Sequence, residues 1–141
     1  MSEVFETQFT DTLVGLASLC LEYTDLSGCQ PDTLWFYCYM EDGETNFLAF
    51  CQEKGKYLFM DQIGKPALLL QMLKLGVQDL LALQKLFAAH KRPVPTEIKV
   101  CCQVAAGTMD TQCNYDRVCP PDGTMTSTDA FLRWHASITN A

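Results

Sequence analysis

The chain has 141 residues, of which 48% are hydrophobic and 19% are charged. This balance is typical of a folded protein and argues against a disordered chain, and the length fits one domain over residues 1–141. With 17 acidic and 10 basic residues the formal net charge is -7. That sign argues against direct binding of nucleic acid, because proteins that bind phosphates present a basic surface.

The first part of the chain predicts one helix and then three short strands. Apolar residues recur every three or four positions across residues 5–23, which is the spacing of one helix face. The aromatic-rich segment 32–40 is too short for a typical helix and predicts a strand. An Asp-Gly turn leads to a returning strand over 45–52, and a second turn leads to a short strand over 57–60. Consecutive strands joined by tight turns indicate an antiparallel meander.

The second part of the chain predicts a long helix, two further strands and a closing helix. A helical pattern runs over residues 66–90, and Gly76 inside it indicates close packing against a neighbour. Alternating apolar residues predict a strand over 98–104, and its partner strand is predicted over 109–118. A short amphipathic helix follows over 126–138, and its first residues fit a capping box.

The order of these elements is helix, three strands, helix, two strands and helix, which defines the fold class as α+β. Strands joined as hairpins indicate one antiparallel sheet with the helices packed against it. We expect the helices to cover one face of that sheet. No segment of the sequence has the composition of a linker, so one domain is predicted.

The aromatic strand allows two interpretations. One set of alternating side chains contains Trp35, Tyr37 and Tyr39, and the opposite set is also apolar. This pattern fits a central strand that is buried on both sides. It also fits a partly exposed aromatic row, which would bind a protein partner because Tyr and Trp are favoured at interfaces.

The eight cysteines are predicted to be reduced thiols in a cytoplasmic protein. Their share of the chain is below that of a disulfide scaffold, several lie inside apolar strand patterns, and the first residues lack the features of a signal peptide. No Cys-x-x-Cys pair occurs, and His90 and His135 are the only histidines, so we predict no metal site and no cofactor. Polar residues interrupt the apolar segment 67–89, so no membrane-spanning helix is predicted.

The sequence carries none of the common motifs that indicate catalysis. It has no phosphate-binding loop, no GxGxxG, no HExxH and no GxSxG. A cysteine nucleophile would need a histidine beside it, and neither histidine has a candidate partner nearby in the sequence. We therefore predict that the protein is not an enzyme and that it has no catalytic residues.

The charges are distributed unevenly along the chain, which suggests a binding role. Residues 1–53 contain ten acidic residues and no Lys or Arg. Such a segment attracts and orients a cationic partner, although an acidic face that only keeps the protein soluble has the same pattern. We predict that a partner binds to acids near the end of the first helix and in the first hairpin: Glu22, Asp25, Asp32, Glu41, Asp42 and Glu44.

Features in the second half of the chain carry a resemblance to a protein family. The long helix ends QKLFAAHKRPVPTEIKV, the segment GTMDTQCNYDRV follows, and the closing helix carries a tryptophan. The features are, in chain order, Pro95, Gly107, the pair Tyr115-Asp116, and Trp134. Together with the early hairpin they resemble the YezG-like immunity protein family over residues 5–138.

The resemblance implies an antitoxin. Such proteins bind and neutralise a cognate toxin domain, often a nuclease, in the cytoplasm of bacteria that use polymorphic or contact-dependent toxins. A nuclease must be basic where it meets phosphates, so an acidic inhibitor fits that surface. The resemblance therefore predicts a monomer that binds a basic nuclease in a one-to-one complex and blocks its active site or substrate path.

A second resemblance leads to a different function. The element order, small size and acidic charge are also similar to those of class I type III secretion chaperones, which are dimers that bind an unfolded effector segment. The helix predicted over 66–90 is longer than is usual in that family. The two functions differ in oligomeric state and in whether the bound partner is folded.

Overall fold

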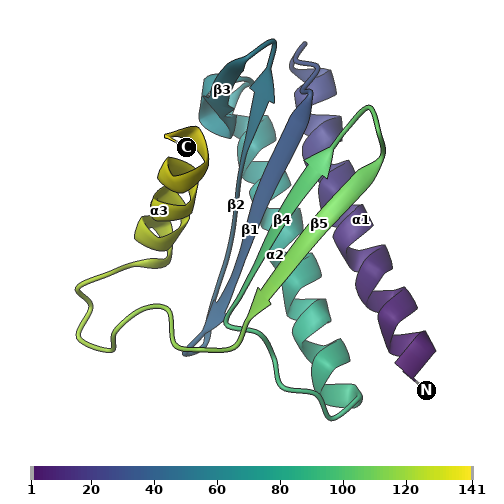
Figure 1. The fold of residues 1–141 in the computed structure, drawn as a ribbon, viewed down its shortest axis with the longest axis vertical. Coiled ribbons are helices and arrows are strands. Elements are labelled where there is room, and N and C mark those ends of the chain that lie inside the picture. The colour runs from purple at the N-terminus through teal and green to yellow at the C-terminus, as the bar shows by residue number, and fades with distance from the viewer. Residues whose placement is uncertain (1, 141) are drawn as a thin grey trace.

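A computed structural model describes residues 2–140, and its helices and strands follow the predicted order (Figure 1). The fold class is α+β, as predicted. A short 3-10 helix, η1, follows the third strand. The elements are, in chain order, α1 (Ser2–Leu26), β1 (Thr33–Glu41), β2 (Glu44–Glu53), β3 (Lys56–Phe59), η1 (Met60–Gln62), α2 (Pro66–Ala89), β4 (Glu97–Gln103), β5 (Thr108–Asn114) and α3 (Ser127–Thr139).

The strands form one antiparallel sheet in the order β3-β2-β1-β4-β5. β1 lies at the centre and pairs with β2 on one side and with β4 on the other, so that Phe36 lies opposite both Ala49 and Val100. The first three strands form the predicted meander, and β4 and β5 form the predicted hairpin. The two edges of the sheet are therefore β3, with four residues, and β5, with seven.

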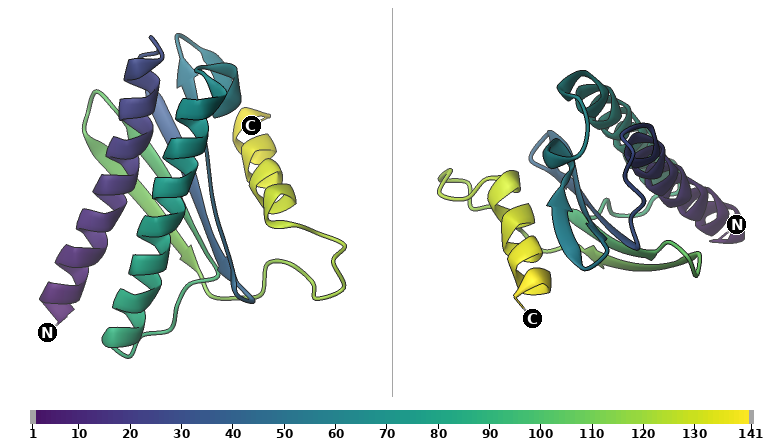
Figure 2. Two further views of the ribbon diagram at one scale, coloured as in Figure 1. Left: turned by 180° about the vertical axis from the view of Figure 1, so that it is seen from behind. Right: turned by 90° about the horizontal axis from the view of Figure 1, so that it is seen from above.

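The helices cover both faces of the sheet, which corrects the expectation that they would share one face. α1 and α2 lie side by side on one face, and α3 lies on the other (Figures 1 and 2). The physical reason lies in β1, where both alternating sets of side chains are buried in separate cores. Because successive side chains of a strand point to opposite faces, each face needs its own cover.

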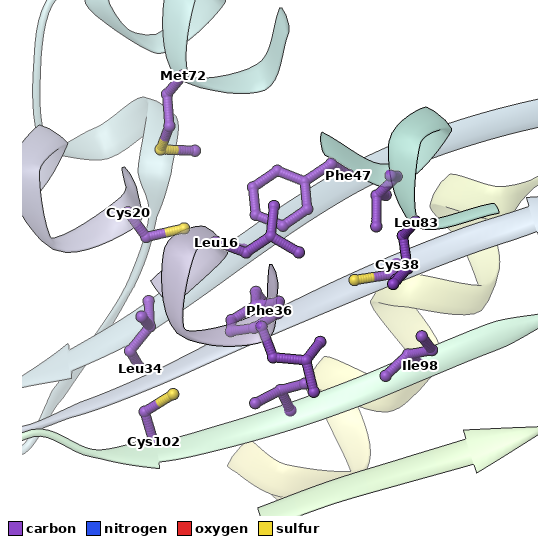
Figure 3. Packing of buried hydrophobic residues seen from close by; sticks show 14 of the residues in the cluster. Leu16, Cys20, Leu34, Phe36, Cys38, Phe47, Met72, Leu83, Ile98 and Cys102 are labelled. Atoms are coloured by element: carbon purple, nitrogen blue, oxygen red, sulfur yellow. The ribbon is translucent and has the colours of Figure 1, made fainter. Parts of the chain in front are cut away.

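The core beneath α1 and α2 combines both helices with the central strands. Leu16 of α1, Phe36 of β1 and Leu83 of α2 are buried together in it (Figure 3). Gly76 of α2 packs directly on the ring of Phe47, since a β-carbon at this glycine would lie 2.4 Å from Cδ2 of that ring. The close packing predicted at Gly76 is therefore confirmed.

The opposite core is aromatic and lies between α3 and strands β1 and β2. Trp35 stacks on Phe50 with the ring centroids 4.8 Å apart, and Phe131 of α3 lies against Tyr37. Trp35, Tyr37 and Tyr39 are 7%, 0% and 3% exposed. The interpretation of β1 as a central strand buried on both sides is confirmed. The alternative interpretation, a partly exposed aromatic row, is wrong.

α2 is long and apolar enough to cross a membrane if only its length and composition are considered. In the fold its inner face packs toward the sheet, where Leu80 and Leu83 are buried. Leu70 and Leu81 lie on its outer side and stay exposed. That the protein does not enter a membrane stays a prediction.

The capping box predicted at the start of α3 is present. The Thr126 hydroxyl accepts a hydrogen bond from the Asp129 backbone N–H at 3.1 Å, and the Asp129 carboxylate accepts one from the Thr126 N–H at 2.9 Å. We expect Thr126→Ala to lower the free energy of unfolding by about 1 kcal/mol, because one helix N–H loses its acceptor. Urea unfolding measures this loss, and Thr128→Ala, an exposed position in the same turn, is the control. An equal loss in both variants would contradict a capping role.

Candidate partner-binding surface

The six acids predicted to bind a partner lie at two opposite ends of the sheet (Figure 1). One group lies where α1 ends and β1 begins and consists of Glu22, Asp25 and Asp32. The other group lies at the turn between β1 and β2 and consists of Glu41, Asp42 and Glu44. β1 runs from the first group to Glu41 of the second over nine residues, and at a rise of about 3.4 Å per residue its length is about 30 Å. The structure therefore does not bring the six acids together as one site.

Glu41 is buried and holds a distant part of the chain in place. Its carboxylate accepts hydrogen bonds from the backbone N–H groups of Val118 and Cys119 and from the Tyr39 hydroxyl, each at 2.9 Å. These bonds hold the chain against the β1–β2 turn, so β5 ends at Asn114 and does not run to Val118 as predicted. Only 7% of Glu41 is exposed. This burial corrects its assignment to a partner-binding surface, because a partner has no access to the carboxylate.

Asp42 and Glu44 are exposed, but they also contact the segment that leads to α3. Asp42 forms an ion pair with Arg117. Glu44 accepts a hydrogen bond from the Ser127 hydroxyl at 2.6 Å, and the same hydroxyl accepts one from the Asn46 amide at 3.0 Å. The β1–β2 turn therefore anchors the connection between β5 and α3 near both of its ends. A structural role accounts for these two acids as well as for Glu41.

The other three acids surround the C-terminal end of α1. Glu22 lies at the rim of an apolar groove between α1 and α2. Asp25 and Asp32 line an open groove of about 810 Å³ between this end of α1 and the β4–β5 turn. Asp32 also accepts a hydrogen bond from the backbone N–H of Lys54 at 2.8 Å. This group therefore contacts the β2–β3 turn through the backbone of Lys54.

The exposed side of α1 keeps the acidic character that the sequence indicates. The helix contains no Lys or Arg, and all five of its acids are exposed. Among residues 2–140, Glu6 is the one acid of α1 that forms an ion pair, with Arg92 at 3.4 Å. Val4 and Val14 are exposed on the same helix. The surface that we call the α1 outer face consists of Glu3, Val4, Asp11, Val14, Glu22 and Asp25.

Sequence reasoning missed Asp11, although the helical spacing contained the signal. At about 100° per residue, Asp11 lies on the same side of a helix as Glu22 and Asp25. The buried residues Leu16 and Cys20 lie on the opposite side. The apolar periodicity that predicted α1 therefore also predicts which of its acids share an outward face.

Most cysteines of the described residues are buried, and this affects their reactivity. Within residues 2–140, no cluster of three or more His, Cys, Asp or Glu side chains could hold a metal ion. Burial raises the pKa of Cys102 to about 11 and that of Cys51 to about 12, so both thiols are protonated at neutral pH and are weak nucleophiles. His135 packs on the Phe59 ring with the centroids 4.3 Å apart, and burial lowers its pKa.

No protein-family model matches the chain, and the comparison with curated proteins also found no match. A functional assignment therefore depends on the residues and their geometry. The resemblance to YezG-like immunity proteins stays a prediction.

Proposed function

We propose that the protein is an immunity protein that binds a cognate toxin domain and neutralises it stoichiometrically. The α1 outer face carries this proposal. Its four carboxylates are exposed and form no ion pair within residues 2–140, and no base lies on the helix. Such a surface favours a basic partner, because complementary charge speeds encounter and disfavours like-charged proteins.

A nuclease domain has the surface that this face would fit. A nuclease is basic where it meets the phosphates of its substrate, so the α1 outer face would cover the same region that nucleic acid needs. The exposed Val4 and Val14 lie among the acids and supply apolar contact area, which the centre of a stable interface requires. The mechanism we propose is therefore a block of the active site or of the substrate path, with no chemical step.

The features that carry the family resemblance support the same proposal. Pro95 precedes β4, Gly107 lies in the β4–β5 turn, and the Tyr115-Asp116 pair follows β5. Trp134 lies in α3 and packs on Tyr37 in the aromatic core. The proline before a strand, the glycine turn and the closing helix with a tryptophan agree with the order that the resemblance implies. The Tyr-Asp pair, which the resemblance places at the end of the second strand, lies just beyond β5, which ends at Asn114.

The first experiment is capture of the partner by the tagged chain in its source cell. We expect a one-to-one complex with a compact basic domain, identified by mass spectrometry and weighed by light scattering. The isolated domain should cleave RNA or DNA, and addition of one equivalent of this protein should stop the cleavage. A folded partner whose activity is unaffected by the bound chain would contradict neutralisation.

One observation favours the chaperone alternative. Leu70 and Leu81 are 67% and 47% exposed on the outer side of α2, and an exposed apolar surface suits either a second copy or an unfolded apolar segment. Light scattering of the protein alone separates the two functions. An obligate dimer whose partner is a long protease-sensitive segment would replace the immunity proposal, whereas a monomer would exclude the chaperone.

Charge reversal on the α1 outer face tests how the partner is recognised. We expect the triple variant Asp11→Lys, Glu22→Lys and Asp25→Lys to slow association with the captured toxin about 10- to 100-fold at low salt, because the steering field is inverted. All three side chains are exposed, so the fold should be retained. Stopped-flow association at several salt concentrations gives the rates.

The matched control carries the same change in net charge at scattered exposed positions: Asp61→Lys, Asp79→Lys and Asp116→Lys. We expect this control to slow association far less. Equal slowing in the two triple variants would mean that only the net charge matters, and the role of the α1 outer face would be lost.

A further inference from the structure

The outer edge of β5 is an open row of hydrogen-bonding groups. β5 pairs with β4 along residues 108–114, and within residues 2–140 no strand lies on its other side. Most of its side chains are exposed. An unpaired strand edge is a template on which another strand can form main-chain hydrogen bonds.

The opposite edge of the sheet, at β3, is protected from pairing with another strand, whereas the β5 edge is not. β3 has only four residues and begins with Lys56, and both short length and lysine discourage pairing. Beyond β3, helices contact β2: Gln84 of α2 donates a hydrogen bond to Thr45 at 2.9 Å, and Asn46 donates one to Ser127 of α3 at 3.0 Å. β5 contains neither Lys nor Pro, and its register with β4 is unbroken.

The edge strand β5 carries one acid and no base. Asp110 is the one charged residue of β5, and it is exposed. The N-terminal part of α1 lies near the end of this strand, since Glu6 and Cys113 line the same groove. The base in that groove, Arg92, is already paired with Glu6. A strand added to this edge therefore meets the negative charge of Asp110, which forms no ion pair within residues 2–140.

The α3 side of this edge also has room for an added strand. An open groove of about 460 Å³ lies between α3 and strands β4 and β5. Lys99, Asp110 and Gln112 line it from the strands, and Trp134 and Ile138 line it from α3. Side chains of an added strand that point to this face would lie next to this groove.

We propose that an extended, lysine- or arginine-bearing strand of the toxin pairs with the outer edge of β5 and continues the five-stranded sheet. This inference deepens the proposed function and rests on it. The added strand would supply main-chain hydrogen bonds at β5, and its basic side chains would lie beside Asp110 on the α3 face of the sheet. The long-range attraction of the α1 outer face would speed the encounter, and the β5 edge would fix the orientation.

A second copy of this chain fits the edge less well than a basic strand does. Antiparallel pairing of two β5 strands would place two base-free α1 helices on the same face of the joined sheet. Each chain also carries a formal net charge of -7. Like charges brought together in this way oppose association.

The probe for the test is a capped octapeptide that alternates lysine and valine, added to the full ¹⁵N-labelled chain. We expect amide shift changes and slower hydrogen exchange in β5 and none in β3. Asp110→Lys should weaken binding about tenfold, because it removes the attraction and places a lysine on the edge. Asp116→Lys is the matched control, with the same charge change just beyond the strand, and it should retain most of the affinity.

Three outcomes would overturn the inference: no binding of the octapeptide, equal binding of a version with proline at its centre, or a protein dimer formed through β5. The captured toxin separates this inference from the function on which it rests. Failure to capture and neutralise a toxin removes the proposed function. A neutralised toxin whose complex shows no added hydrogen-exchange protection in β5 removes only the strand pairing.

Discussion

Replacement of Glu41 by alanine is expected to lower the free energy of unfolding by about 3 kcal/mol, a large part of the stability of a chain of this size. The variant leaves three donors without their acceptor: the N–H groups of Val118 and Cys119 and the Tyr39 hydroxyl. Each buried donor left unsatisfied costs about 1 to 3 kcal/mol. Urea unfolding monitored by the fluorescence of Trp35 and the other tryptophan measures the loss.

The matched control is Glu44→Ala, at the other end of the same turn. Glu44 is exposed and accepts one hydrogen bond, from the Ser127 hydroxyl, so its loss should cost about 1 kcal/mol or less. Similar losses for the two variants would mean that Glu41 is not the anchor of the 115–126 segment. A direct readout is faster hydrogen exchange at Val118 and Cys119 in the Glu41 variant.

The contribution of Glu41 should also depend on pH in a defined direction. Burial alone would raise the pKa of its carboxyl, but the hydrogen bonds from Val118, Cys119 and Tyr39 together outweigh burial and the pKa is lowered. A carboxyl with a lowered pKa stabilises the fold above its unfolded-state pKa of about 4.3, and this stabilisation is lost as the pH falls through the folded-state pKa. The stability difference between the native chain and Glu41→Gln should therefore be full at pH 6 and shrink in acid. A difference that stays constant into strong acid would contradict this role.

The element order was predictable because local periodicity determines it. The three-to-four spacing of α1 and α2 and the alternation in β4 each lie within one segment, so each could be recognised without its neighbours. The placement of α3 was not predicted, although β1 contained the necessary signal. Trp35 and Phe36 belong to opposite faces of a strand that is apolar on both, and such a strand requires a cover on each side.

The division of the candidate site was also readable from the sequence. Asp32 and Asp42 flank a segment predicted to be a strand, and the ends of a nine-residue strand lie about 30 Å apart. The role of Glu41 could not be read in this way. Its partners Val118 and Cys119 lie more than 70 positions away in the sequence, and no local pattern indicates that the chain returns to this turn.

The net charge of a sequence segment predicts an acidic surface less well than the positions of the acids and bases in the fold do. Residues 1–53 have no base, but in the fold Glu6 pairs with Arg92 and Asp42 pairs with Arg117. On α1, four of the five acids are exposed away from the core and form no ion pair within residues 2–140. The prediction of an acidic binding surface therefore becomes one about the outer face of a single helix.

Two glycine-to-alanine substitutions should act in opposite directions. Gly15 lies within α1 and has nothing within 4 Å of where a β-carbon would be, so Gly15→Ala should stabilise the protein by about 0.5 to 1 kcal/mol through helix propensity. Gly76 lies within α2, and a β-carbon there would be 2.4 Å from Cδ2 and 2.8 Å from Cγ of Phe47. Gly76→Ala should therefore destabilise by about 2 kcal/mol, because overpacking outweighs the same propensity gain.

The double variant Gly76→Ala with Phe47→Leu identifies the clash as the cause. Phe47→Leu alone should destabilise, because it leaves space in a core where Phe47 is 1% exposed. In the Gly76→Ala background, Phe47→Leu should lower the free energy of unfolding by less, because the alanine methyl group occupies part of the space that the leucine leaves. A double-mutant cycle in urea measures the coupling, which should be about 1 kcal/mol or more in the favourable direction. Simple additivity of the two losses would mean that α2 can move away from β2 and that Gly76 does not set the distance between them.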